Sequence, residues 1–242
     1  MASRLFSNFL TVGGATLISR VLGFVRDTMI AAELGTGPVA DAFFVAFRLP
    51  NLFRRLFAEG AFNSAFVPLY ARTLEGEGEA AARTFARDTF GMLVLSLAAV
   101  SAVAMIGAPW LVGLLAPGFG EEPAKFDLTV FLTRICFPYL ACMSLTGLFG
   151  GILNSHGRFK AAAFAPVLLN VVLIAVLVGI AASGQARTSQ AGVILSWGVA
   201  AAGLAQLLLV VVAVMRGGWG FVRGGRAGPR RSGGSSRSGC RG

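Results

Sequence analysis

The chain has 242 residues, of which 55% are hydrophobic and only 13% are charged, and its mean hydropathy is +0.74. The charged share is about half of that in ordinary soluble domains, which excludes a soluble globular protein. The net charge of +10 does not indicate a nucleic-acid partner, because seven of the 21 basic residues lie between positions 216 and 241, where there is no acid.

Six membrane-spanning helices are predicted along the chain, because each span needs about 20 apolar residues. The expected spans are about 5–32, 39–70, 88–115, 129–153, 161–183 and 190–215, with ends placed to within about two to four residues. Four stretches, 89–120, 135–155, 161–186 and 188–215, contain no Asp, Glu, Lys or Arg. The predicted fold class is therefore all-α, a polytopic membrane helical bundle over residues 1–215.

Charged side chains set the first two spans apart from the other four. They are Arg20, Arg26, Asp27, Asp41, Arg48, Arg54, Arg55 and Glu59. Ionised groups at membrane depth normally face one another or a water-filled cavity, so these residues predict a polar pocket inside the bundle. The same charges, with no small-residue cleavage site after a short apolar core, argue against the alternative that the first span is a signal peptide.

Helical spacing indicates which charges are available to a ligand. Candidate members of supporting ion pairs are Asp27, Arg48, Arg55 and Glu59. Arg20 and Arg54 have no carboxylate three or four residues away. Arg20 and Arg26 are expected about 120° apart around their helix, an angle at which the two side chains could flank one cleft. Guanidinium groups match phosphate oxygens, which favours a phosphate or pyrophosphate ligand. The alternative is that these arginines reach the membrane interface or form internal ion pairs.

Loop charges predict the orientation in the membrane, because short cytoplasmic loops are enriched in Lys and Arg. Basic residues occur at the N-terminus, in the second and fourth loops and after the sixth span: Arg4, Arg72, Arg83, Arg87, Arg158, Lys160 and Arg216. Both termini are therefore expected in the cytoplasm.

Residues 216–242 are rich in Gly, Ser and Arg and are predicted to be a disordered tail. An unselected extension is favoured over the alternative that this tail binds RNA or anionic lipid.

No motif for catalysis is present in the sequence. GxxxxGK[ST], GxSxG and HExxH are absent, and the cysteines and the single His156 have no metal-ligand spacing. We expect no enzyme activity, no cofactor and no metal, and we interpret His156 as an ordinary loop residue rather than a proton relay.

Four motifs resemble the MurJ (MviN) family of lipid II flippases, in the multidrug/oligosaccharidyl-lipid/polysaccharide exporter superfamily. They are SRVLGFVRD at 19–27, DAFFVAFRLPNLFRRLFAEGAFNSAFVP at 41–68, APGF at 116–119 and FAPVLLN at 164–170. The resemblance covers about residues 1–215 and implies the N-terminal lobe of a two-lobed transporter in the bacterial inner membrane. It places the cavity arginines of the family on Arg20, Arg26 and Arg54, and its important acidic residue on Asp41, expected to act in gating or cavity electrostatics.

The resemblance also implies lipid II, the undecaprenyl-pyrophosphate-linked peptidoglycan precursor, as the ligand. Membrane lipids and cell-wall synthesis proteins are the other expected partners. Family members are about twice as long, so we expect the chain to lack the second lobe and to be inactive alone, because alternating access needs two bodies. Alternatives are an exporter of small cationic or drug-like solutes and a membrane scaffold with a basic tail.

Overall fold

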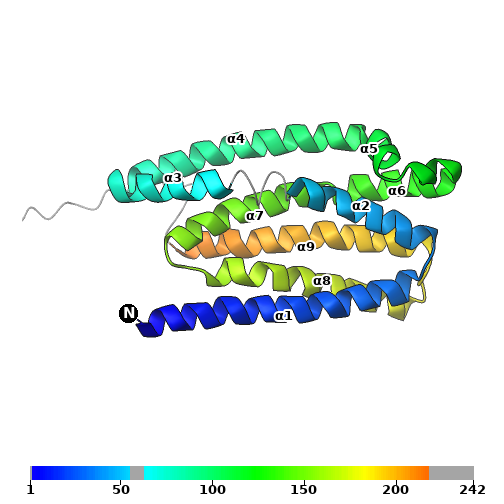
Figure 1. Cartoon of the computed structure of the whole chain (residues 1–242), viewed down its shortest axis with the longest axis horizontal. Coiled ribbons are helices and arrows are strands. Elements are labelled where there is room, and N and C mark those ends of the chain that lie inside the picture. The colour runs from blue at the N-terminus through cyan, green and yellow to red at the C-terminus, as the bar shows by residue number, and fades with distance from the viewer. Residues whose placement is uncertain (1, 55–62, 218–242) are drawn as a thin grey trace, which may run out of the picture.

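The computed structural model describes residues 2–54 and 63–217 of the chain (Figure 1). Arg55, Glu59 and the predicted tail from residue 218 onward lie outside the described residues. Within them all regular structure is helical. The helices are α1 (Ala2–Leu34), α2 (Pro38–Arg54), α3 (Asn63–Gly76), α4 (Glu79–Ile106), α5 (Ala108–Leu115), the 3-10 helix η2 (Pro117–Glu121), α6 (Pro123–Cys136), α7 (Pro138–Ser155), α8 (Lys160–Ser183) and α9 (Ser189–Arg216).

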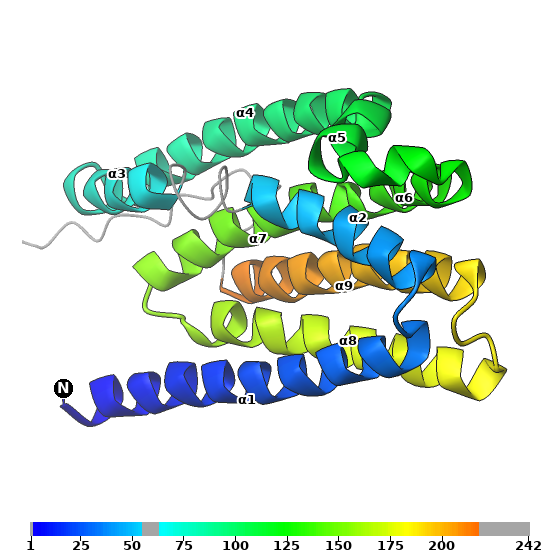
Figure 2. The same ribbon diagram turned by 45° about the vertical axis from the view of Figure 1, so that its right-hand side comes forward.

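The long helices lie side by side along one axis of the molecule (Figures 1 and 2). α1 and α8 form one side, α4 forms the other, and α7 and α9 lie between them, with α2 packed on α6. We call the end that carries the start of α1, the α3–α4 turn and the end of α9 the proximal end. The distal end carries the α1–α2 turn, η2 and the α8–α9 turn.

Among the described residues, four helical segments are long and apolar enough to cross a membrane: Glu79–Ile106, Pro123–Ser155, Lys160–Ser183 and Ser189–Arg216. The last two agree with the predicted spans 161–183 and 190–215 to within one residue at each end. α1 extends over 33 residues but carries charge, and the predicted span 39–70 includes residues outside the described part of the chain. The all-helical class is confirmed, whereas the count of six spans stays a prediction.

Two expected spans are interrupted in the structure, and a proline accounts for each interruption. The segment expected at 88–115 begins at Glu79 and breaks at Gly107 into α4 and α5, just before Pro109. The segment expected at 129–153 begins at Pro123 and breaks at Phe137, just before Pro138. A proline has no N–H to donate to the carbonyl four residues earlier, and its ring collides with that carbonyl.

The break at Gly107 frees a carbonyl that another helix satisfies. Pro109 cannot donate to the carbonyl oxygen of Met105, and Nε of Arg134 on α6 donates to that oxygen at 3.1 Å. Arg134 therefore ties the end of α4 to α6.

Small residues let the central helices approach closely. A Cβ added at Gly203 on α9 would lie 2.7 Å from Cδ2 of Tyr139 and 3.2 Å from Cβ of Cys142, both on α7. Tyr139 is buried in the apolar core that also contains Phe43, Leu132 and Leu173. Close approach at glycine is a common way for membrane helices to gain packing contacts.

Candidate functional site

A groove of about 840 Å³ opens among α1, α2, α7, α8 and α9. Its polar lining consists of Arg26, Asp27, Arg48, Asn51 and Gln206. Its apolar lining consists of Phe44, Phe47, Leu52, Tyr139, Met143, Pro166 and Leu169. This volume falls within the usual range for ligand sites, which combine a mostly apolar wall with a few converging polar groups. We call it the central groove.

Arg26 is held in the central groove by a network of hydrogen bonds. Its Nε and Nη2 donate to Oδ1 of Asp27 at 2.9 and 2.7 Å, and its Nη1 donates to Oδ1 of Asn170 at 2.7 Å. Asn170 is buried on α8, and its Nδ2 donates to the carbonyl oxygen and hydroxyl of Ser19 at 2.8 and 3.3 Å. The network therefore joins α1 to α8 and orients a guanidinium that is only 16% exposed.

Among the described residues that line the groove, Arg48 supplies the net positive charge. The carboxylate of Asp27 balances Arg26 through the ion pair at 2.7 Å. Arg48 is exposed on α2, lines the groove, and makes no hydrogen bond or ion pair with any other residue that the structure describes. The charges of Arg26, Asp27 and Arg48 thus sum to +1, and the unpaired guanidinium is available to an anion.

The remaining predicted site residues lie outside the groove or outside the described structure. Arg20 is exposed on α1, is absent from the groove lining and has no partner among the described residues. The backbone of Arg54 ends α2, but its side chain belongs to the part of the chain that is not described, as do Arg55 and Glu59. The structure thus brings Arg26, Asp27 and Arg48 together and leaves Arg20 apart.

Asp41 lies at the distal end, in the first turn of α2. Its Oδ2 accepts a hydrogen bond from Nζ of Lys125 at 2.8 Å, within an ion pair that joins α2 to α6. A cavity of about 480 Å³ borders this pair and is also lined by Phe44 and Glu122.

Sequence reasoning missed three residues of these sites. Lys125, Asn170 and Gln206 received no role. Gln206 is fully buried, and its Nε2 donates to the carbonyl oxygen of Ala165 at 2.5 Å, next to Pro166. A lone amide within an apolar span is itself a signal, because polar side chains at membrane depth face the inside of the bundle.

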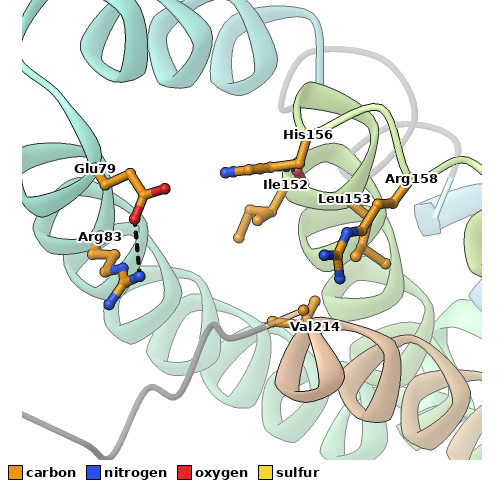
Figure 3. A pocket seen from close by; sticks show the side chains of 8 residues that line it. Glu79, Arg83, Ile152, Leu153, His156, Arg158 and Val214 are labelled. Atoms are coloured by element: carbon orange, nitrogen blue, oxygen red, sulfur yellow. Dashed lines mark hydrogen bonds and ion pairs between the residues drawn. The ribbon is translucent and has the colours of Figure 1, made fainter.

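A second pocket of about 300 Å³ lies at the proximal end. Figure 3 shows Glu79 and Arg83 on α4 facing His156 across it. Its charged side chains have favourable neighbours of their own. Arg83 pairs with Glu79 at 3.1 Å. The guanidinium of Arg158 lies against Gly217 at the C-terminus of α9, where Nη1 is 2.5 Å from the position that a Cβ on Gly217 would take. A cation at a helix C-terminus is already stabilised by the helix dipole, so this pocket offers an anion less than the central groove does.

Long apolar helices around a charged groove define a helical membrane protein. Residues 30–225 match the family model of the lipid II flippase MurJ. The chain is 57% identical over 215 residues to the "Probable lipid II flippase MurJ" of Rhizobium meliloti (strain 1021), with 88% of this chain and 40% of the relative covered. It is 43% identical to the "Lipid II flippase MurJ" of Burkholderia cenocepacia over 85% of this chain and 39% of that relative.

A solved structure supports the same fold. The chain superimposes on "Lipid II flippase MurJ, inward closed conformation" with a TM-score of 0.68 at 23% identity, covering 85% of this chain and 42% of the solved one. The chain belongs to the lipid II flippase MurJ family, as its motifs predicted. It spans about 40% of the length of the curated relatives that it matches.

Proposed function

We propose that the chain takes part in lipid II translocation and that the central groove binds the pyrophosphate-linked headgroup. The observation that carries this proposal is Arg48, a guanidinium with no partner among the described residues, which lines the same groove as the hydrogen-bonded Arg26 and has aromatic neighbours in its walls. Guanidinium groups remain charged when they are removed from water and bind phosphate oxygens through two parallel hydrogen bonds. Arg20 and Arg54 are proposed as further headgroup ligands on the family motifs alone.

The proposed role is transport without covalent chemistry. Alternating access requires two bodies that move around a shared site, and the described helices form one bundle. We therefore propose that this bundle supplies one wall of the site and acts together with a second body.

The proposed location is the bacterial inner membrane, with both termini in the cytoplasm. Basic residues gather at the proximal end, where Arg83 and Arg158 line one pocket and Arg216 is the last residue of α9. The distal end has Glu121, Glu122 and Asp127 near Lys125. This asymmetry agrees with the enrichment of Lys and Arg in cytoplasmic loops.

Binding to the purified full chain in lipid nanodiscs tests the proposal. The probe is a fluorescent undecaprenyl-pyrophosphate-linked disaccharide, and a cationic dye is the comparison ligand. Loss of a charge-assisted hydrogen bond costs about 1.5–3 kcal/mol, so Arg48→Gln should weaken probe binding by about 10- to 150-fold. Lys160→Gln removes an equal charge from an exposed position at the proximal end and should leave the affinity unchanged.

Other results would favour the alternatives. Tighter binding of the cationic dye, strengthened by Arg48→Gln, would favour an exporter of cationic solutes. Loss of probe binding on deletion of residues 218–242, with the groove variants unaffected, would favour a scaffold with a basic tail. Equal probe affinity for Arg48→Gln and Lys160→Gln would refute the groove assignment.

A further inference from the structure

Lys125 joins three segments at the distal end of the bundle. Its Nζ lies 2.8 Å from Oδ2 of Asp41 on α2 and 4.2 Å from the ring centroid of Phe119 in η2. The Lys125 side chain is only 12% exposed, whereas that of Asp41 is 54% exposed. A lysine ammonium above an aromatic ring gains a cation–π interaction as well as the ion pair. One ammonium thus connects the motif at 41–68 with the APGF motif at 116–119, for which no role was predicted.

The helix that carries Lys125 does not by itself favour a cation there. Lys125 lies in the first turn of α6, where the partial positive charge of the helix N-terminus opposes a lysine. Asp41 lies in the first turn of α2, where a carboxylate is favoured. The position of Lys125 is therefore stabilised by its partners across the fold, and Glu122 is the other charged group that lines the adjoining cavity.

α1 and α2 are tied to different neighbours on either side of their short connection. At the end of α1, the carbonyl oxygen of Glu33 accepts a hydrogen bond from the N–H of Arg187 in the α8–α9 turn at 2.7 Å. α2 packs on α6 and is held there by Lys125. Gly35, with φ of 70°, begins the connecting turn in a conformation that favours glycine. Movement of α2 relative to α1 would therefore concentrate in this turn.

We propose that Lys125 is a positioning residue for the central groove. Through Asp41 it holds α2 against α6, and α2 carries Arg48 two turns further along, about 10 Å from Asp41 along the helix axis. Lys125 does not line the groove, so it acts on Arg48 only through the position of α2. The inference rests on the proposed function for its consequence in ligand binding, but its geometric part can be measured without a ligand.

The first experiment measures groove geometry in the full chain in nanodiscs. Arg48→Cys is introduced together with Cys142→Ala and Cys240→Ala, and the rate at which the new thiol reacts with a membrane-impermeant thiol reagent is recorded. Lys125→Glu should change that rate, and the charge-swapped pair Asp41→Lys with Lys125→Asp should restore it. Glu122→Gln is the matched control, because Glu122 lines the same cavity but forms no ion pair with another described residue. An unchanged rate in Lys125→Glu, or no restoration in the swapped pair, would overturn the positioning role.

The second experiment uses the lipid-pyrophosphate probe with Arg48 intact. Lys125→Glu should weaken probe binding by about five- to tenfold, at the lower end of the range for coupling between two sites, and the swapped pair should recover most of the loss. Absence of probe binding to the unmodified chain, together with the expected change in thiol reactivity, would refute the proposed function but retain the positioning role. Probe binding that is insensitive to Lys125→Glu would refute the link between Lys125 and the groove.

Discussion

Gly203→Ala should destabilise the chain although alanine is the better helix former. The new Cβ would lie 2.7 Å from Cδ2 of Tyr139, closer than side chains tolerate, so the buried ring must shift. Overpacking of this kind costs about 1–3 kcal/mol, whereas exchange of glycine for alanine inside a helix gains about 1 kcal/mol. The expected net effect is a loss of about 0–2 kcal/mol.

Gly179→Ala is the matched control for this substitution. Gly179 lies inside α8, and an added Cβ there meets nothing within 4 Å, so only the helix-propensity gain applies. The two variants should therefore differ by about 1–3 kcal/mol, with Gly203→Ala the less stable. For chains of this size each kcal/mol corresponds to a shift of about 2–4 °C in Tm.

Thermal unfolding of the detergent-purified chain, followed by fluorescence-detected size exclusion, measures both variants against the unmodified chain. Tyr139 also lines the central groove, so Gly203→Ala should in addition weaken probe binding below the Tm, whereas Gly179→Ala should not. A Tm for Gly203→Ala equal to or above that of Gly179→Ala would show that the α7–α9 contact is not tight, contrary to our reasoning.

Three further substitutions test single contacts between or within helices. Asn170→Ala removes the hydrogen bonds that join α8 to α1. A hydrogen bond between membrane helices contributes about 0.6–1.7 kcal/mol, so this variant should lower the Tm by several degrees. An unchanged Tm would contradict the network. Arg134→Leu should lower the stability of the chain by about 0.5–1.5 kcal/mol, because the Met105 carbonyl loses its donor. In a Pro109→Ala background residue 109 regains an N–H, so unfolding measurements should show a smaller loss there. Thr188→Ala removes the oxygen that caps α9 and should cost about 0.5–2 kcal/mol, whereas Thr188→Ser should retain the Tm.

Hydropathy was sufficient to locate the apolar helices but not their interruptions. α8 and α9 were predicted almost to the residue, because each is an uncharged run bounded by turn residues such as Gly184 and Thr188. The breaks at Gly107 and Phe137 were missed, because Pro109 and Pro138 each remove a single hydrogen bond and hardly change the hydropathy of a span.

For the site residues, the sequence was sufficient to predict their spacing around one helix but not their contacts with other helices. Spacing on α1 separated Arg20 from Arg26 by about 120°, and in the structure Arg26 meets α8 while Arg20 is exposed. Which of the two faces would meet another helix depends on how α1 is rotated against α8, and no single-helix pattern contains that rotation. The partner of Asp41 was likewise inaccessible, because Lys125 is 84 residues away in the sequence.

The combined length of α6 and α7 bears on the surroundings of the distal ion pair. Together they extend over 33 residues, which is about 50 Å at 1.5 Å per residue, whereas the hydrocarbon layer is about 30 Å thick. A tilt of about 20° would shorten a straight helix of this length by only about 3 Å, so the two helices, although they are broken at Phe137, are long enough together for one end to reach the lipid headgroups. The charged stretch at 121–127 is the segment suited to emerge. Dissolved ions would then reach the contact between Asp41 and Lys125, and added salt should loosen it while leaving the partly buried hydrogen bond between Asn170 and Ser19 intact.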